Sequence, residues 1–164
     1  MMSIMETVYL ETTIISYLAS EPSRDLIVAG HQQITQDWWM QRRALFACSI
    51  SQEVVDEISR GDSAQVIRRL ALARTLPLLT ASGEAERLTL LLLRSGALPA
   101  IATSDAAHLA IATTAGMDYL LTWNCRHIAN GQILKKVAAV CEQAGFRLPA
   151  VCTPEELMGG NANV

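Results

Sequence analysis

Short apolar runs alternate along this chain with longer segments in which apolar residues recur every three or four positions. The short runs predict strands at TVYL (7–10), LFACSI (45–50), DYLLTW (118–123) and AVC (150–152). The longer segments predict helices at 11–18, 25–46, 51–58, 63–75, 83–95, 103–116 and 132–144. Helical segments between successive strands are typical of parallel pairing. The pattern therefore predicts an α/β fold with a central parallel sheet of about four or five strands flanked by helices.

Capping residues mark the ends of several predicted helices. Ser51 is a suitable N-cap for the helix that follows the second strand, and Asn130 for the helix before the last strand. Gly61, Gly116 and Gly145 follow three of the predicted helices, where glycine commonly ends a helix. These residues place helix boundaries where the hydrophobic spacing changes.

The composition indicates one folded domain. The chain has 164 residues, of which 51% are hydrophobic, 5% aromatic and 18% charged. This composition excludes intrinsic disorder, which needs low hydrophobicity and high net charge. The sequence contains no internal repeat, low-complexity tract or linker rich in Pro, Gly or Ser. We therefore expect a single domain over residues 1–164.

Neither a membrane span nor a secretory signal is predicted. No apolar run approaches the roughly 18 to 20 residues that cross a bilayer, and residues 1–6 do not open a signal peptide. The four cysteines, Cys48, Cys125, Cys141 and Cys152, form no CxxC pair and have no zinc-ligand spacing. We expect no membrane partner, a reducing cytoplasmic setting, and cysteines that act as small buried hydrophobic residues.

The charge balance does not by itself favour a polyanionic partner. Lys and Arg total 13 against 16 Asp and Glu, which gives a net charge of −3. A nucleic-acid substrate would therefore need a local basic patch or a bound metal ion. The Arg pairs at 42–43 and 68–69 are candidates for such a patch, although we favour solvated helix faces.

Polar residues gather at the predicted carboxyl ends of the strands. Glu11 follows the first strand, Glu57 lies in the helix after the second, and Asp105 begins a later helix. Thr122 and Asn124 end the third strand. Functional groups of open parallel sheets lie beyond these strand ends, so we expect the side chains to meet in one cleft. Oxygen ligands without His or Cys favour Mg²⁺ or Mn²⁺, while ordinary helix capping, above all by Asp105, is the alternative.

Four local sequences carry a family resemblance. They are VYLETTIISYL (8–18), SQEVVDEI (51–58), SDAAHLAIA (104–112) and YLLTWN (119–124). In this order they resemble the motifs of PIN-domain nucleases: a strand with Asp-Thr-Asn before an apolar helix, a Ser six residues before an acid, an Asp-Ala helix, and a closing Thr-x-Asp. The segment 146–157 is similar to the last strand and closing helix of VapC-like members.

The resemblance implies a fold, an activity and partners. It implies a PIN-like three-layer domain with motifs in residues 5–130 and a C-terminal strand and helix in 146–158. It also implies a Mg²⁺- or Mn²⁺-dependent endoribonuclease of the VapC toxin type, with an RNA substrate, a protein antitoxin and a homodimer. The implied catalytic residues are Glu11, Glu57, Asp105 and Asn124, of which Glu11, Asp105 and Glu57 hold the metal. The residues implied to position substrate or water are Thr12, Thr122 and His127.

Three positions depart from the family pattern. Glu11 stands where the family usually has Asp, Thr13 where it has Asn, and Asn124 where it has a fourth acid. An amide oxygen can bind a metal but adds no negative charge, so we expect one ion rather than a preformed pair. The alternative function is a catalytically silent PIN domain that binds RNA or protein. A nucleotide-binding regulator is disfavoured, because no Gly-rich loop follows the first strand.

The neighbours of these residues have simpler interpretations. We expect Glu53 and Asp56 to be solvated, although Glu53 lies one turn before Glu57. His108 is expected to be a hydrogen-bonded helix histidine rather than a cleft residue. For His127, contact with a substrate phosphate or water and a purely structural role are equally open. Strand alternation should turn Trp123 into the core.

Overall fold

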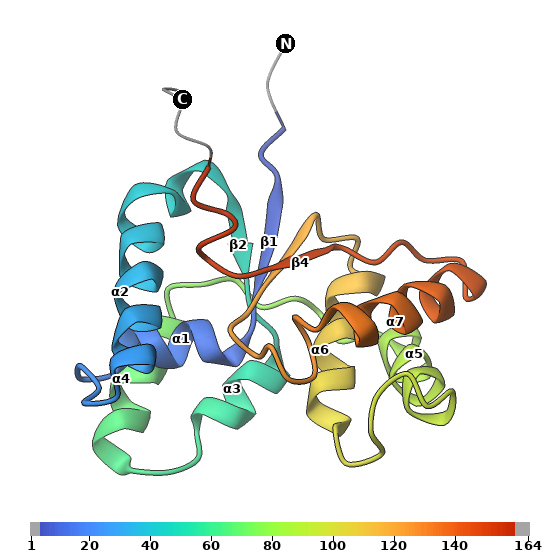
Figure 1. Ribbon diagram of the computed structural model, residues 1–164, viewed down its shortest axis with the longest axis horizontal. Coiled ribbons are helices and arrows are strands. Elements are labelled where there is room, and N and C mark those ends of the chain that lie inside the picture. The colour runs from blue at the N-terminus through green and yellow to red at the C-terminus, as the bar shows by residue number, and fades with distance from the viewer. Residues whose placement is uncertain (1–3, 160–164) are drawn as a thin grey trace.

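The computed structural model describes residues 4–159 and contains one parallel four-stranded sheet (Figure 1). The strands are β1 (Thr7–Leu10), β2 (Ala47–Ser49), β3 (Tyr119–Leu121) and β4 (Ala150–Cys152), in the spatial order β2-β1-β3-β4. The helices are α1 (Thr12–Ala19), α2 (Leu26–Gln41), α3 (Gln52–Ile58), α4 (Ser63–Ala73), α5 (Gly83–Arg94), α6 (Thr103–Thr114) and α7 (Gly131–Gln143). The predicted α/β class, with a parallel sheet flanked by helices, is confirmed. The expected domain span 1–164 includes residues 1–3 and 160–164, which lie outside the described residues.

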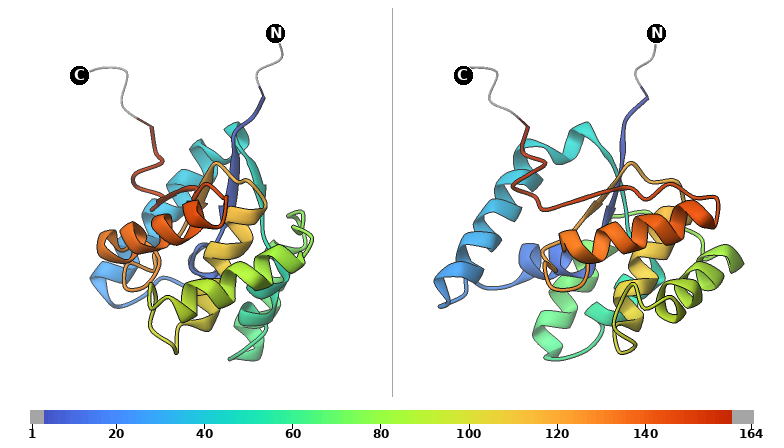
Figure 2. Two further views of the ribbon diagram at one scale, coloured as in Figure 1. Left: turned by 90° about the vertical axis from the view of Figure 1, so that its right-hand side faces the viewer. Right: turned by 45° about the vertical axis from the view of Figure 1, so that its right-hand side comes forward.

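The helices form two groups around the sheet. Figure 1 shows α1 to α4 on the left and α5 to α7 on the right, with the strands between them. In the two views of Figure 2, α5, α6 and α7 again lie together, and α5 packs on both α6 and α7. Within residues 4–159, no helix combines the length and the apolar composition needed to cross a membrane.

The two central strands set the position of the site. Val8 pairs with Tyr119 and Leu10 with Leu121, and β1 is also parallel to β2. Leu10 and Leu121 are fully buried, as expected for strands covered by helices on both faces. Because all four strands run in the same direction, their carboxyl ends meet at one edge. The residues that follow β1, β2 and β3 therefore share that edge.

The connection between α2 and β2 differs from the sequence prediction. The predicted helix 25–46 and strand 45–50 overlap, whereas in the structure α2 ends at Gln41 and β2 spans Ala47–Ser49. Between them, Arg43–Leu45 forms a 3₁₀ turn in which the amide of Leu45 donates to the carbonyl of Arg42 at 2.9 Å. The apolar residues at 45 and 46 fit both the helical spacing and the strand pattern. In the structure they belong to neither element, because the chain turns there.

The predicted C-terminal helix is wrong, although strand β4 is confirmed. Residues 154–157 form a hydrogen-bonded turn, in which the amide of Leu157 donates to the carbonyl of Thr153 at 3.2 Å. The Glu156 carboxylate accepts from the Thr153 amide at 2.7 Å and closes this turn. Gly159 has a φ of +85°, a left-handed conformation that ends the helical turn. The spacing of Glu155, Glu156 and Leu157 is typical of a helix, but the segment forms only one hydrogen-bonded turn.

Candidate functional site

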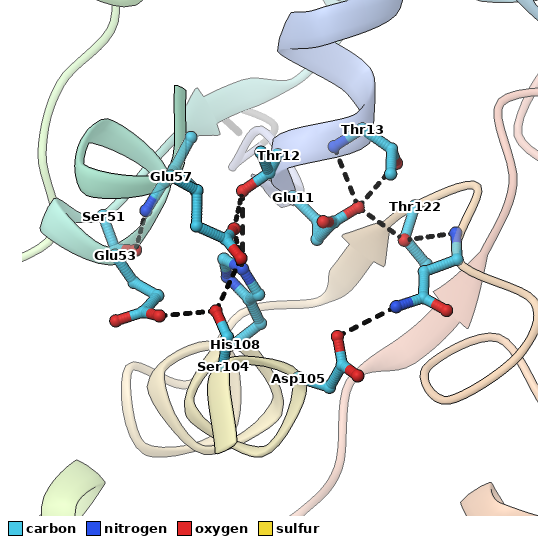
Figure 3. Close-up of polar contacts among 12 residues, drawn as sticks. Glu11, Thr12, Thr13, Ser51, Glu53, Glu57, Ser104, Asp105, His108 and Thr122 are labelled. Atoms are coloured by element: carbon cyan, nitrogen blue, oxygen red, sulfur yellow. Dashed lines mark hydrogen bonds and ion pairs between the residues drawn. The ribbon is translucent and has the colours of Figure 1, made fainter. Parts of the chain in front are cut away.

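Glu11 is the buried centre of the carboxyl edge of the sheet. It follows β1 and caps α1, and its side chain is only 4% exposed. Its Oε2 atom accepts hydrogen bonds from the amide and hydroxyl of Thr13, at 3.1 and 2.5 Å, and from the hydroxyl of Thr122 at 2.7 Å (Figure 3). Within residues 4–159, no hydrogen bond reaches its Oε1 atom. Glu11 is thus rigidly oriented by one oxygen while the other stays available.

Glu57 approaches Glu11 from helix α3. Ser51 caps this helix as predicted, which turns the chain directly from β2 into the helix that carries Glu57. One oxygen of Glu57 accepts from the hydroxyl of Thr12 and lies 2.8 Å from His108 Nε2, and the other accepts from Ser104 at 2.6 Å. Partial burial raises the pKa of Glu57, but the hydrogen bonds and charge of His108 outweigh it and lower the pKa to about 2. Glu57 is therefore ionised at neutral pH.

Glu53 belongs to the same cluster, so its predicted exposure to solvent is wrong. It is half-buried, and its Oε1 atom lies 2.5 Å from the Ser104 hydroxyl, which also lies 2.6 Å from Glu57 (Figure 3). A hydroxyl has one hydrogen and can donate to only one of these oxygens. The two carboxylates therefore compete for the one hydrogen of the Ser104 hydroxyl. The one-turn spacing of Glu53 and Glu57 was the available sequence signal.

His108 is the hydrogen-bonded helix histidine that the sequence predicts, but its partners were not anticipated. The ring is 1% exposed and lies between Glu57 and the fully buried Tyr9, whose hydroxyl is 2.7 Å from Nδ1. Burial lowers the pKa of His108, whereas its hydrogen bond to Glu57 and the charges of Glu11, Glu57 and Glu53 raise it above its ordinary value. His108 and Glu57 thus form a close hydrogen-bonded contact inside the cluster.

Asp105 anchors the opposite rim of the site. Its Oδ1 atom accepts from the side-chain amide of Asn124 at 2.9 Å, and its Oδ2 atom lies 2.9 Å from His127 Nδ1. The side chains of Asp105 and His127 are each 20% exposed. The backbone amide of Asn124 donates to the Thr122 hydroxyl, which joins this rim to Glu11. The predicted residues Asp105, Asn124 and His127 therefore form one connected group.

The residues that could together hold a metal ion overlap in part with the expected ligands. Glu11, Glu57 and His108 each offer one possible ligand atom, and these atoms lie within 4.8 Å of one another. Asp105, expected beside Glu11 and Glu57, is not part of this group and is held by Asn124 and His127. Its contacts with Asn124 and His127 direct Asp105 toward the turn after β3. Two of the three expected ligands, Glu11 and Glu57, thus have possible ligand atoms within 4.8 Å of each other.

The site has an excess of negative charge. Glu53 and Glu57 lie on α3, Asp105 lies on α6, and Glu11 lies between β1 and α1. Within residues 4–159, no Lys or Arg forms an ion pair with any of them, and the basic side chains that contact them are His108 and His127. Carboxylates that are shielded from water and have no Lys or Arg partner are costly, so the donor set fits a hard divalent cation.

The remaining sequence predictions have mixed outcomes. Asp56 is exposed, Trp123 is packed in the core against His31, and Asn130 caps α7, all as expected. Cys48 and Cys141 are buried as predicted, but Cys125 is exposed because it lies in the turn after Asn124. The Arg pairs make local contacts: Arg43 stacks over Trp39, Arg68 bonds to Ala19 and Glu21, and Arg69 bonds to Gln65.

Comparison with known proteins adds no family assignment. No protein-family model matches the chain, and none of the curated proteins is significantly similar to it in sequence. The function must therefore be inferred from the geometry of the site and from the motifs of the chain itself.

Proposed function

We propose that the protein is a metal-dependent endoribonuclease of the PIN type, acting as a VapC-like toxin. The observation that carries the proposal is the convergence of Glu11, Glu57 and Asp105 at the carboxyl edge of a parallel sheet, with no Lys or Arg paired to them within residues 4–159. Phosphodiester hydrolysis by such a site needs a cation, because carboxylates alone repel the substrate phosphate.

The donor set supports Mg²⁺ or Mn²⁺. Glu11 and Glu57 would hold the ion, since carboxylate oxygens are the ligands that these metals prefer, and Asp105 adds a third negative charge at the rim. The free Oε1 atom of Glu11 is consistent with this role. A divalent ion bound there supplies Lewis-acid chemistry: it lowers the pKa of water and offsets charge that develops on a phosphate.

The chain's own residues orient this machinery. Thr13 and Thr122 fix Glu11, whereas Thr12 and Ser104 fix Glu57. His127, held by Asp105 and partly exposed, is placed at the rim to contact a substrate phosphate or a water. The reaction would leave a 3′-hydroxyl and a 5′-phosphate on cleaved single-stranded or loop RNA.

The proposed partners follow from the same family resemblance. They are an RNA substrate, a second copy of the chain, and a protein antitoxin whose C-terminal segment would cover the acidic residues of the site, in a cytoplasmic setting. On α5, Leu90 and Leu91 are 49% and 47% exposed, which supports a protein interface. The cluster of Glu11, Glu53, Glu57 and Asp105 would suit a basic side chain of the antitoxin.

A catalytically silent domain is the alternative, and one observation favours it. Asn124 replaces an acid and engages Asp105 instead of leaving it free. Incubation of purified protein with labelled single-stranded RNA and Mg²⁺ or Mn²⁺ decides between the two functions. We expect cleavage by the wild type, a loss of at least about 100-fold in Glu57→Gln, and normal cleavage in Asp56→Asn, a matched change on the exposed face of α3. RNA left equally intact by the wild type and Glu57→Gln would establish the silent domain.

A further inference from the structure

A buried chain of polar groups stands behind Glu57. The hydroxyl of Tyr9 lies 2.7 Å from both Ser51 Oγ and His108 Nδ1, and His108 Nε2 lies 2.8 Å from Glu57 Oε2. Tyr9 is fully buried, and Ser51 and His108 are 3% and 1% exposed. Figure 3 shows the His108 ring beside the Glu57 carboxylate, whereas Thr122 lies on the other side of Glu11. These hydrogen-bonded groups thus connect the core with one oxygen of Glu57.

His108 has two possible roles at this position, metal ligand or support for a ligand. Its ring lies close enough to Glu11 and Glu57 to be a ligand. However, Nε2 faces a carboxylate oxygen, which only accepts hydrogen bonds, so Nε2 carries its hydrogen there and has no free lone pair. Nδ1 is directed to the Tyr9 hydroxyl inside the core. Neither nitrogen is therefore free to bind an ion.

We propose that Tyr9 and His108 are positioning residues for Glu57: the Tyr9 hydroxyl fixes the His108 ring, and the ring holds Glu57 for the divalent ion without binding the ion itself. This inference rests on the proposed function, because Glu57 is the residue through which both act. Outer partners of this kind orient the groups that touch a metal, and their loss typically lowers metal affinity by about 10- to 100-fold.

Tyr9 is suited to this role by its place in the fold. It lies on β1 two residues before Glu11, it contacts the N-cap of α3, which carries Glu57, and it contacts α6 through His108. One hydroxyl therefore links the three elements that bear Glu11, Glu57 and Asp105. Removing it changes the relative placement of the acids without altering any of them.

The test compares Tyr9→Phe with the wild type in two measurements. The first is Mn²⁺ binding followed by electron paramagnetic resonance, which reports affinity and any directly coordinated imidazole nitrogen. The second is nitrogen-15 NMR of the histidine rings in metal-free protein, where only three histidines contribute signals. Tyr119→Phe removes a hydroxyl that bonds to Glu6 away from the site, and Val137→Ala weakens the core in α7, so both serve as controls.

We expect no coordinated imidazole nitrogen in the wild type, a loss of Mn²⁺ affinity of about tenfold in Tyr9→Phe, shifted His108 ring signals, and wild-type affinity in both controls. A coordinated nitrogen that disappears in His108→Gln would overturn the inference. So would a Val137→Ala variant that loses as much affinity as Tyr9→Phe. If the wild type binds no Mn²⁺, the proposed function fails. The NMR signals of the metal-free protein then test separately whether Tyr9 positions the His108 ring, and unchanged His108 signals in Tyr9→Phe would overturn that role.

Discussion

The hydroxyl of Thr122 donates a 2.7 Å hydrogen bond to Glu11 Oε2, although the two residues lie 111 positions apart. The contact arises because β1 and β3 are parallel neighbours, with Leu10 opposite Leu121, so that the next residue of each strand meets at the same edge. Both residues are almost completely buried. Thr122 thus connects the end of β3 to the central acid of the site.

Thr122→Val should lower the free energy of unfolding by about 1.5 to 3 kcal/mol, because the buried Glu11 carboxylate loses a hydrogen-bond donor. Valine has nearly the same volume as threonine, so the packing around it changes little. Chemical denaturation without divalent ions measures this difference. Thr113→Val, the same change at a buried threonine on α6 outside the site, is the control. Equal stability of Thr122→Val and the wild type would show that Glu11 does not depend on this bond.

The stability of the metal-free protein should fall in acid through Glu57. Its folded-state pKa of about 2 lies below its ordinary value of 4.5, so its ionised form stabilises the fold above about pH 4.5. The contribution is lost progressively as the pH falls from about 4.5 to about 2. Urea denaturation across this range measures the free energy of unfolding at each pH. This free energy should change less with pH in Glu57→Gln than in the wild type and Asp56→Asn. Parallel profiles for all three proteins would contradict the assignment.

Asn124→Asp should have opposite effects with and without metal. The amide of Asn124 donates to Asp105, so a carboxylate there faces another carboxylate and lowers the free energy of unfolding of the metal-free protein. The added charge should also raise Mn²⁺ affinity. Thermal unfolding with and without Mn²⁺ measures both effects. A variant with unchanged melting temperature in both conditions would place Asn124 outside the site.

The exposed leucines of α5 predict self-association. Light scattering at micromolar concentration should give the mass of a dimer, and replacement of Leu90 and Leu91 by Glu should give a monomer, because charge opposes burial of this surface. Ile67→Glu on α4, where the side chain is also exposed, should leave the mass unchanged. A monomeric wild type would exclude this interface.

Sequence patterns predict which strand ends and helices carry the site residues. They predict less well which side chains of the site contact one another. The apolar run at 7–10 and the residues after it place Glu11 at a strand end, because parallel strands bring their carboxyl ends together. The pairing of Glu57 with His108 joins α3 to α6 across 51 residues and depends on how the two helices pack. We expect Asp105 beside Glu11 and Glu57 from the sequence. Its contacts with Asn124 and His127 depend on the conformation of the turn after β3, which residue spacing does not predict. Helical spacing does show that Ser104 and His108 share a face, which was the available signal for their common partner.

Calorimetric titration with Mn²⁺ tests most directly whether the converging carboxylates hold a divalent ion. The variants are Glu11→Gln, which keeps the size of the buried side chain and removes its charge, and Glu6→Gln, which changes an exposed glutamate that bonds to Tyr119. The predicted result is binding at one site by the wild type and Glu6→Gln, with affinity at least about tenfold lower in Glu11→Gln. Absence of binding by the wild type, or equal affinity in Glu11→Gln, would contradict the assignment of a divalent-ion site.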